Sequence, residues 1–467
     1  MSTWTGNPAA AFSAQKYSGI SVISSVSVKL DGMNTREKIT DRIINRLSQG
    51  KDAVTKKRIQ KAIRLGAGGV LLTQASAIAA VTAIDIRRKY RHPPKNSFPY
   101  CEPQHLRTPR GDITVYTYGA HLYQAQLKAI REAKHHIYFE IFIMKADKIG
   151  KAYRKALIAA AKRGVEVYII IDTWGNLNQP PSFRHYPDLP HLHVIRFPLI
   201  RPGILTGNPR QKGRDHRKIL CIDGNVGFVG GYNIGKIYEK QWRDTHIQLT
   251  GSQVWELENA FTDMWNMYRS HRRHPEIPDS GASYWNPEVR AAANTPAFNS
   301  YPVRGLYLES INRAAKRIWI TMGYFIPDEG LRNSLKQAAR RGVDVRILLP
   351  RYSNHIVADW VGRPYYTELL QSGVRIFWFK DAMVHAKTMT ADGAWSTVGT
   401  TNIDRLSMSG NFEINLEIFS SEMASLMEEI FRVDLSNSVE VTLERWENRS
   451  RIAKLGERIL RPLGPLL

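Results

Sequence analysis

Residues 216–223 read HRKILCID and residues 385–392 read HAKTMTAD, so one His-x-Lys-x4-Asp frame occurs twice. An asparagine follows each histidine by seventeen positions and an acidic residue follows it by twenty-eight, with no insertion in either copy. Scattered surface charges would not keep this register, whereas a structural repeat does. The paired positions are His216 and His385, Lys218 and Lys387, Asp223 and Asp392, Asn233 and Asn402, and Asp244 and Glu413.

The residues around each histidine are predicted to form a strand. In the first copy Ile219, Leu220 and Ile222 follow the histidine, and another apolar run begins at Val226. Alternate residues of a strand share a face, so the histidine and lysine of each copy should point the same way. Two such faces would bring paired imidazoles, ammonium groups and asparagine amides into one cleft. That cleft suits a tetrahedral phosphoryl group, whose oxygens it would stabilise as charge develops.

These side chains suggest a covalent mechanism. One imidazole can attack phosphorus and form a phospho-histidine, while the other protonates the leaving alkoxide and later deprotonates an incoming hydroxyl. We expect Asp244 and Glu413 to hold the second nitrogen of each ring and fix its tautomer. Gly231 would let the backbone approach the phosphate. The fixed cations do the work of a metal ion, so we expect neither a metal nor another cofactor.

A second repeated string supports two α/β units. Residues 161–167 read AKRGVEV and residues 339–345 read ARRGVDV. Basic residues followed by glycine end a helix, and the apolar run after each string is typical of a buried strand. The order helix, strand, helix, strand predicts helices packed on a mixed sheet, with the active site between the halves. We place the first half at 113–275, a joint at 276–296 and the second half at 297–435.

The segments outside the repeat have less regular patterns. Residues 1–48 lack periodicity and are expected to be loosely ordered. Within 49–92, the uncharged stretch 65–84 is predicted to cross a membrane as one helix, with a buried or interfacial helix as the alternative. A proline-containing linker is expected at 93–112. Residues 436–467 should form a helix packed on the second half; a basic amphipathic helix that contacts a membrane is the other interpretation.

Composition indicates a polyanionic partner. The chain has 467 residues, of which 43% are hydrophobic, and its formal net charge is +24. Such a charge favours nucleic acid or an anionic lipid surface, and charge alone does not choose between them. The two cysteines, Cys101 and Cys221, form no visible disulfide framework and are interpreted as reduced thiols in a cytosolic setting.

The extended strings around both frames resemble the phospholipase D superfamily, whose members carry two HKD motifs, and more narrowly its cardiolipin synthase branch. The resemblance covers roughly residues 113–467. The strings that carry it are DHRKILCID at 215–223, GGYNIG at 230–235, WRDTH at 242–246, VHAK at 384–387, VGTTNIDR at 398–405 and NFE at 411–413.

This resemblance implies two phospholipase D-like α/β domains with mixed sheets, packed pseudo-symmetrically. The N-terminal region departs from the family, because many relatives have two membrane helices and this chain shows at most one membrane-associated helix. It implies a phosphatidyl-histidine intermediate with phosphatidylglycerol as donor and acceptor, and it gives His216 the nucleophile role and His385 the acid/base role. Asp223 and Asp392 are expected to be structural, held in salt bridges away from the phosphate. Thr400 stands where many relatives have serine, and its hydroxyl can still donate to substrate.

Two other functional classes remain open at this point. An HKD nuclease would use the same residues on nucleic acid, although the apolar stretch and the extended strings make nucleic acid an unlikely partner. A non-catalytic membrane scaffold would not need all the duplicated residues intact. The acceptor could be a second lipid, glycerol, another alcohol or water, and hydrolysis of phospholipid is therefore an alternative. We expect the protein at a bacterial cell membrane, with its catalytic domains on the cytoplasmic side and anionic phospholipid as its partner.

Overall fold

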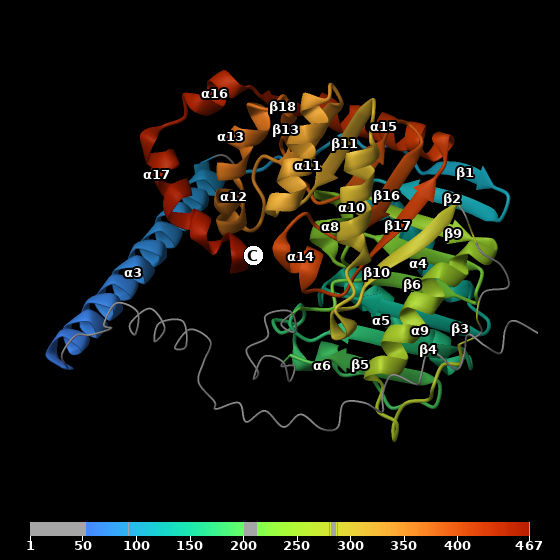
Figure 1. Cartoon of the computed structure of the whole chain (residues 1–467). Coiled ribbons are helices and arrows are strands. Elements are labelled where there is room, and N and C mark those ends of the chain that lie inside the picture. The colour runs from blue at the N-terminus through green and yellow to red at the C-terminus, as the bar shows by residue number, and fades with distance from the viewer. Residues whose placement is uncertain are drawn as a thin grey trace, which may run out of the picture. The chain divides into compact units, whose positions relative to one another are not determined.

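A computed structural model describes residues 53–91, 93–199, 213–279, 281, 286 and 288–466 of the chain. The predicted loosely ordered region at 1–48 lies outside the described residues. From residue 93 onward the described chain builds two α/β halves, each around an eight-stranded sheet, as Figure 1 shows. The prediction of two α/β units with mixed sheets is confirmed.

The first sheet is mixed. Its three strands β3, β4 and β5 run parallel, and the remaining neighbours pair antiparallel. The spatial order is β1 (Gln104–Thr108), β2 (Gly111–Tyr116), β9 (His246–Thr250), β7 (Val226–Gly230), β6 (Lys218–Ile222), β3 (His136–Ile141), β4 (Glu166–Asp172) and β5 (Leu192–Phe197).

The second sheet repeats the first from β2 to β5, while β1 of the first sheet and β18 of the second are additional edge strands. Strands β11, β12 and β13 are parallel, and the strands on either side of them are antiparallel. The spatial order is β10 (Val289–Asn294), β17 (Glu413–Phe419), β16 (Trp395–Gly399), β15 (Lys387–Ala391), β11 (Arg317–Met322), β12 (Asp344–Pro350), β13 (Arg375–Phe379) and β18 (Ser438–Val441).

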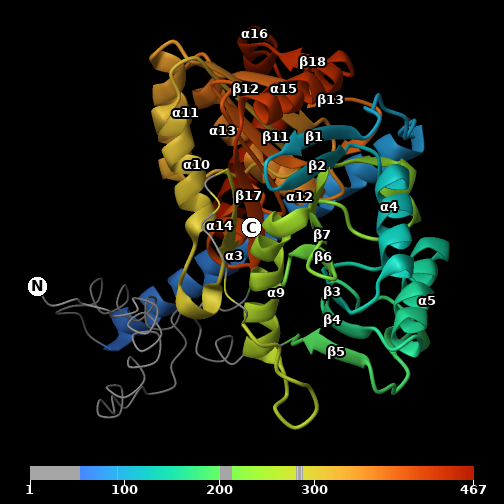
Figure 2. The same cartoon turned by 90° about the vertical axis from the view of Figure 1, so that its right-hand side faces the viewer.

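Helices cover both faces of the first sheet. Figure 2 shows α4 (Gly119–Glu132) and α5 (Lys148–Lys162) on one face and α9 (Trp255–Tyr268) on the other. Leu122 and Leu157 pack on Phe139 and Val167 to form one core, and Phe261 of α9 packs against the opposite face. Because both faces are covered, the parallel strands read as nearly continuous apolar runs.

The second half has a corresponding set of helices. Its core joins helix side chains such as Tyr307 and Leu335 to Ile320 and Ile347 of the sheet. The helices are α10 (Pro302–Arg313), α11 (Glu329–Arg340), α12 (Ile356–Gly362), α13 (Pro364–Leu370), α14 (Arg405–Ser409) and α15 (Ser421–Ser436). The short helices α6 (Pro181–Arg184) and α8 (Lys236–Lys240) belong to the first half, and three 3-10 turns lie at Gly251–Val254, Pro296–Phe298 and Arg461–Leu466.

The repeated helix ends are confirmed. Helices α5 and α11 end one residue before Arg163 and Arg341, and the next residues, Gly164 and Gly342, have φ angles of +91° and +90°. Side chains other than glycine rarely adopt this left-handed conformation, so each glycine turns the chain into the following strand. At the other end of α5, Asp147 accepts hydrogen bonds from two backbone N–H groups as an N-cap.

Some predicted connections contain strands. Strand β1 and the start of β2 lie inside the predicted linker 93–112, because Leu106 packs on the core and the two strands form a hairpin. Strand β10 lies inside the predicted joint 276–296. Strand β18 lies inside the predicted C-terminal helix 436–467, where it pairs with β13. In each case proline or polar neighbours obscured a short edge strand. Both cysteines are free, as predicted.

The predicted membrane segment 65–84 lies within α3 (Ala53–Arg91). Across the described ranges, the structure contains no helix that is both long and apolar enough to cross a membrane. The single span is therefore not supported. Part of the uncharged run instead packs on protein: Val81 is 3% exposed and joins Trp360, Val361 and Leu460 in a small core.

The chain after β18 forms two short helices rather than one long one, α16 (Leu443–Glu447) and α17 (Arg451–Leu460). Trp446 is buried against Tyr366, and Leu460 packs on Trp360, so both helices dock on the second half. One face of α17 nevertheless stays open, since Ile452 is 79% exposed.

Candidate active site

Each histidine lies just before a motif strand, at a point where the two halves exchange backbone hydrogen bonds. The His216 N–H donates to the Phe412 carbonyl at 3.0 Å, and the His385 N–H donates to the Arg243 carbonyl at 2.7 Å. The second contact extends a short parallel pair, β8 (Trp242–Arg243) with β14 (Met383–Val384). Each histidine backbone is therefore anchored on the half that does not contain it.

Each histidine pairs with a carboxylate from the other half. His216 Nδ1 lies 2.9 Å from an oxygen of Glu413, and His385 Nδ1 lies 2.7 Å from an oxygen of Asp244. The sequence predicted both partners, and the structure shows that each histidine takes the carboxylate of the opposite half. A ring that donates from Nδ1 to a carboxylate keeps its lone pair on Nε2, the tautomer suited to attack or to proton transfer. At His385 the Nζ of Lys387 also lies 2.8 Å from Nδ1.

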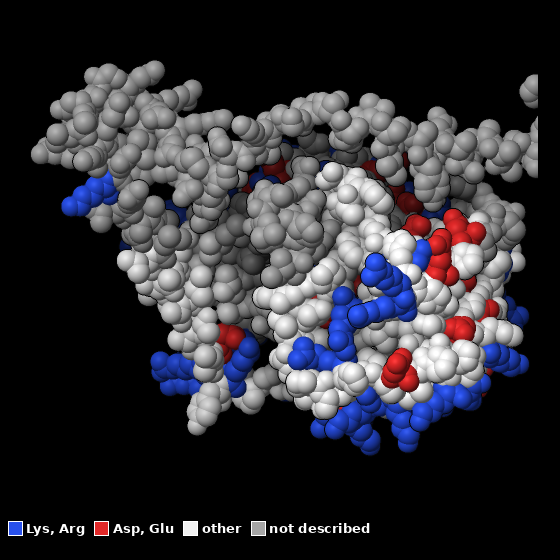
Figure 3. Space-filling view, turned by 90° about the horizontal axis from the view of Figure 1, so that it is seen from below, with Lys and Arg blue, Asp and Glu red and all other residues white. Residues whose placement is uncertain are grey.

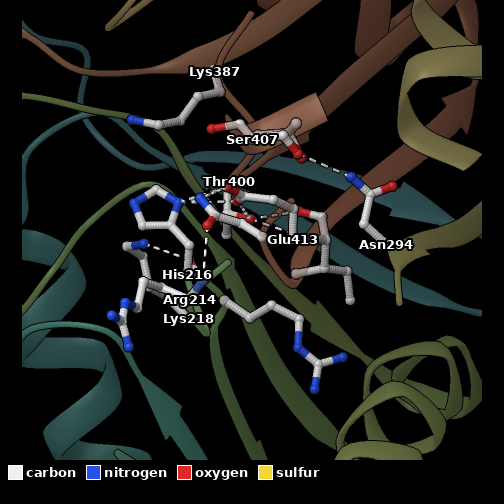
Figure 4. A network of polar contacts seen from close by, with 12 residues as sticks. Arg214, His216, Lys218, Asn294, Lys387, Thr400, Ser407 and Glu413 are labelled. Carbon is white, nitrogen blue, oxygen red and sulfur yellow. Dashed lines mark hydrogen bonds and ion pairs between the residues drawn. The ribbon is translucent and has the colours of Figure 1, made fainter. Parts of the chain in front are cut away.

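Each carboxylate has its own support. The Thr400 hydroxyl donates to Glu413 at 2.6 Å, and the Thr245 N–H donates to Asp244 at 2.8 Å. Figure 4 shows Thr400 beside Glu413, with Lys387 reaching toward His216. Gly231, predicted to admit the phosphate, lies against Asp244: a Cβ there would stand 2.0 Å from a carboxylate oxygen. Thr400 and Gly231 thus position carboxylates in this structure.

The two motif lysines are buried beside the histidines. Lys218 Nζ donates to the His216 carbonyl at 2.6 Å, and Lys387 Nζ donates to the His385 carbonyl. Burial lowers the pKa of Lys218 to about 7 and that of Lys387 to about 8, because ammonium groups lose their hydration there. The nearby carboxylates limit both shifts. A bound phosphodiester anion would favour the charged forms.

Burial and charge also set the histidine states. Burial is the main reason that the pKa of His385 falls to about 3, with Lys387 adding to the shift, and burial likewise lowers the pKa of His216. Burial alone would raise the pKa of Glu413, but the charge and hydrogen bond of His216 hold it below its usual value. Lys387 and His385 do the same for Asp244. Each carboxylate is therefore held ionised by its histidine and the nearby lysine.

The two asparagines lie at equivalent places but have different contacts. Asn233 accepts the Ile143 N–H at 3.1 Å through its side-chain oxygen, which leaves the amide N–H₂ to donate to substrate. Asn402 is 3% exposed, and its side-chain oxygen has no hydrogen-bond partner within the described ranges. Both amides belong to the buried layer that contains the histidines.

The aspartates that end the motifs lie at the far ends of their strands. Asp223 accepts three backbone N–H groups, from Lys134, His135 and His136, at 2.8–2.9 Å. Asp392 accepts the corresponding three, at 315–317, at 2.7–2.9 Å. These bonds fix the start of β3 and β11. The expected structural role fits this placement, but the partners are backbone amides, and in the described part of the chain neither carboxylate forms a salt bridge.

Sequence reasoning missed two buried ion pairs next to the site. Arg243 donates two bonds of 2.8 Å to Asp434, which ties the two halves together beside His385. Arg217 donates a bond of 2.8 Å to Glu140, directly beneath His216. The arginines stand next to Asp244 and His216 in the sequence, and that adjacency was the available signal.

Aromatic rings complete the walls. The Phe142 ring lies 4.9 Å from the His216 ring, and Trp242 and Tyr324 lie 5.1 Å and 5.7 Å from the His385 ring. These contacts fix the orientation of the imidazole rings and exclude water from the edges of those rings. His246 is also buried here, and burial lowers its pKa to about 3, which keeps its ring neutral.

Comparison with known proteins agrees with this geometry. The family model "Cardiolipin synthase, PLD-like domain" matches residues 127–265 and 307–435. A cardiolipin synthase of Clostridium perfringens is 36% identical over 380 residues, 77% of this chain and 78% of that protein. A cardiolipin synthase of Staphylococcus aureus is 33% identical over 374 residues, 77% and 74% of the two chains.

A solved structure shares the fold at low sequence identity. The phosphatidylserine synthase of Haemophilus influenzae has a TM-score of 0.59 and 13% identity, over 81% of this chain and 96% of that one. This likeness concerns the fold alone, whereas the family model covers both HKD motifs. Fold, paired motifs and relatives agree, and the chain belongs to the cardiolipin synthase family of phospholipase D-like enzymes.

Proposed function

We propose that this chain transfers a phosphatidyl group from one phosphatidylglycerol to a hydroxyl of a second, making cardiolipin and releasing glycerol. The observation that carries the proposal is the crossed pair of His–carboxylate contacts, at 2.9 Å and 2.7 Å, with both lysines buried beside it. Two rings with free Nε2 atoms and fixed cations suit a phosphodiester held between them.

In the first step Nε2 of His216 attacks phosphorus. A P–N bond forms, the P–O bond to the head-group glycerol breaks, and the glycerol oxygen takes a proton from Nε2 of His385. The charge that develops on the phosphoryl oxygens is stabilised by Lys218, Lys387 and the asparagine amides. The bound phosphodiester anion favours the protonated form of His385 that this step requires.

In the second step the hydroxyl of another phosphatidylglycerol gives its proton to His385. Its oxygen attacks phosphorus, the P–N bond breaks, and His216 regains its lone pair. The products are cardiolipin and the resting enzyme. Because the same ring donates a proton first and accepts one later, leaving glycerol and entering lipid use the same side of the site.

Lipid mass analysis after incubation with phosphatidylglycerol vesicles tests the function. We expect cardiolipin and free glycerol, and a sample quenched in alkaline denaturant, in which the P–N bond survives, should contain a phosphatidyl adduct on the peptide with His216. Phosphatidic acid as the sole product would show hydrolysis and contradict the transfer function.

We also propose that the enzyme works at the cytoplasmic face of a bacterial cell membrane. Helix α17 supports this, because Ile452 and Leu455 are 79% and 57% exposed and the exposed cations Arg451, Lys454 and Arg458 flank them. Such a face suits an anionic lipid surface. The net charge of +24 agrees, and Figure 3 shows several groups of Lys and Arg on one face.

Vesicle co-sedimentation tests the membrane contact. The double variant Ile452→Glu, Leu455→Glu should bind phosphatidylglycerol vesicles at least about tenfold more weakly, because it buries charge at the interface. Phe298→Glu, at another exposed apolar side chain, should bind normally. Equal binding of all three proteins would exclude α17 as the contact. Protease digestion of spheroplasts and inverted vesicles tests the side of the membrane.

A further inference from the structure

Each half contributes one short helix that borders the active site. Helix α8 begins three residues after Asn233 and leads to the backbone carbonyl that accepts the His385 N–H. Helix α14 begins three residues after Asn402 and leads to the carbonyl that accepts the His216 N–H. Because the two halves exchange these contacts in the same way, an approximate twofold axis relates the helices. They lie on opposite sides of the site, at the same level along that axis.

Both helices expose an apolar side chain at the same position. Ile237 and Leu406 each lie four residues after their asparagine, and they are 40% and 38% exposed. A cation precedes each of them, since Lys236 and Arg405 are also exposed. A single exposed leucine would need no explanation. The same pair of a cation and an aliphatic side chain on both sides of the site indicates a surface that contacts something.

A second equivalent pair lies in the loops after β4 and β12. Trp174 and Tyr352 each lie two residues beyond the end of their strand, and they are 56% and 38% exposed. A cation accompanies each ring: the Arg214 guanidinium lies 5.1 Å from the Trp174 centroid, and that of Arg351 lies 5.5 Å from the Tyr352 centroid. Arg88 of α3 also lies over the Tyr352 ring.

These two loops pack on the walls of the active site. In the first half the Asn176 amide donates to the Phe142 carbonyl at 2.8 Å, and the Phe142 ring lies 4.9 Å from the His216 ring. In the second half the Tyr324 hydroxyl donates to Asn354 at 2.5 Å, and the Tyr324 ring borders the other histidine. Four exposed apolar side chains thus lie around the site, two from each half. We call them the active-site rim: Trp174, Ile237, Tyr352 and Leu406.

The rim also adjoins the proposed lipid-contacting face of α17. The turn Arg461–Leu466, which directly follows α17, contacts both α12 and α14, and Figure 1 shows the C-terminus beside these helices. Trp and Tyr rings prefer the head-group level of a bilayer, and cations beside them attract anionic lipid. A nucleic acid would use the cations but would gain little from Ile237 and Leu406. The chemistry of the rim therefore fits an anionic lipid surface.

We propose that the active-site rim lies on an anionic lipid bilayer while the enzyme works. Its apolar side chains enter the interface, the cations beside them contact lipid phosphates, and the site opens toward the head groups. Phosphatidylglycerol then enters head group first, and the acyl chains of donor and acceptor stay in the bilayer. This route for the substrates rests on the proposed function, whereas the contact between rim and bilayer does not.

The rate on vesicles relative to the rate on monomeric lipid tests the rim. Dihexanoyl phosphatidylglycerol below its micellar concentration reaches the site from solution and needs no membrane contact. We expect the double variant Ile237→Ser, Leu406→Ser to lower the rate on phosphatidylglycerol vesicles at least about tenfold and to keep the monomer rate within about twofold of the parent. A parent-like rate on vesicles overturns the proposal. Equal losses on both substrates also overturn it, because they would show a role in folding or catalysis.

Phe298→Ser is the matched control. Phe298 is a large apolar side chain that is 72% exposed and does not belong to the rim. This variant should keep both rates. A loss on vesicles as large as that of the rim variant would mean that the effect does not depend on the rim, and it would contradict the proposal.

Fluorescence of Trp174 gives a test that does not depend on activity. The difference in emission between the parent and Trp174→Phe reports this one ring. We expect vesicles of brominated phosphatidylglycerol to quench that difference, because the ring enters the interface where the bromines lie within reach. An unquenched difference, at vesicle concentrations that sediment the protein, would place Trp174 off the membrane and contradict the proposal.

These outcomes separate the inference from the proposed function. If the parent protein makes no cardiolipin from either form of phosphatidylglycerol, the proposed function fails, and the quenching of Trp174 still decides the contact. If the parent makes cardiolipin and the rim variant converts vesicles at the parent rate, only the rim assignment fails.

Discussion

The two halves of the molecule share the residues of the HKD motifs but differ in the side chains that lie beneath them. Under His216, Arg217 and Glu140 form a buried ion pair, with the carboxylate 0% exposed. The strand registers and the matching caps of Asp223 and Asp392 place Ala386 and Thr321 at the corresponding positions of the second half. The positions that hold a buried ion pair in the first half thus hold uncharged residues in the second.

The two halves also differ at the residue before each histidine. Asp215 precedes His216, and its N–H bonds to Asp172, whereas Val384 and Pro350 occupy the matching positions of the second half. Burial is the main reason that the pKa of Asp215 lies well above its usual value. The two halves therefore share the groups proposed to contact the phosphodiester and differ in the residues that support them. We infer that the supports, rather than the motifs, distinguish the roles of the two histidines.

The largest expected effect separates those roles. His216→Ala should lower the rate of cardiolipin formation by about 10⁴-fold or more, because no other group can form the covalent intermediate. His385→Ala should lower it by about 10²–10⁴-fold, the usual contribution of an acid/base group. Quantifying lipid products by mass spectrometry checks both.

A donor with a nitrophenol leaving group sharpens the contrast. Nitrophenol needs no proton to leave, so His385→Ala should still give a burst of nitrophenolate equal to the enzyme present, and His216→Ala should give none. A burst in the His216 variant would mean that His385 is the nucleophile and His216 the acid/base.

The crossed carboxylates give the next largest effect. Glu413→Gln and Asp244→Asn should each lower kcat by about 10²–10⁴-fold, because an amide no longer selects the required ring tautomer. Glu413→Gln should suppress the nitrophenolate burst, since its partner His216 is the proposed nucleophile, whereas Asp244→Asn should spare it. The opposite result would mean that carboxylate and histidine pair within one half.

The ionic layer of the first half should appear in stability. Arg217→Met leaves Glu140 as an uncompensated buried charge and should cost about 3–5 kcal/mol of unfolding free energy. The double variant Arg217→Met, Glu140→Gln should regain most of that loss. Thr321→Val, at the matching place in the second half, should cost less than about 1.5 kcal/mol. Urea titration followed by tryptophan fluorescence measures all three, and equal losses in both halves would contradict the asymmetry.

Thr400 should matter less than the carboxylate that it supports. Thr400→Val removes a hydrogen bond of 2.6 Å to Glu413 and should lower kcat/KM by about tenfold, the usual cost of an unpaired buried acceptor. Thr400→Ser keeps the hydroxyl and should stay within about twofold of the parent. Parent-like activity in the valine variant would show that Glu413 needs no second donor.

The smallest effect is expected in the pH profile. Burial lowers the pKa of Lys218 to about 7 and that of Lys387 to about 8, so their charges are lost as pH rises through these values. Burial lowers the pKa of His216, which favours the neutral ring that the proposed attack requires. We expect kcat/KM, which reports the free enzyme, to fall about fivefold between pH 6 and pH 7.5. A flat profile would mean that the lysines stay charged.

The repeat predicted much of this arrangement because spacing encodes it directly. Identical spacing from His216 and His385 to their asparagines and carboxylates predicted equivalent places in two units. The same spacing could not show that Glu413 serves His216, because pairing within a half and pairing across halves give the same frame. That choice depends on backbone bonds between distant segments, such as the one from His216 to Phe412.

Other features depend on tertiary context that no local pattern records. Strand β1 was missed because prolines flank it and its only partner is a hairpin neighbour. Arg217 and Glu140 lie in strand-like segments 77 residues apart, so nothing local shows that they pair. The stretch 65–84 is apolar enough to suggest a membrane span, yet Val81 packs on Trp360 of the second half. Periodicity finds apolar faces but does not say what covers them.

The crossed contacts of His216 with Glu413 and of His385 with Asp244 bear on the ancestry of the molecule. Two separate copies of a single half could form both contacts as a symmetric dimer, since each histidine would take its carboxylate from the other copy. Fusing the copies into one polypeptide makes that encounter intramolecular and independent of protein concentration. Fusion also allows each copy to acquire its own substitutions. A symmetric site could in this way come to have one histidine as nucleophile and the other as acid/base.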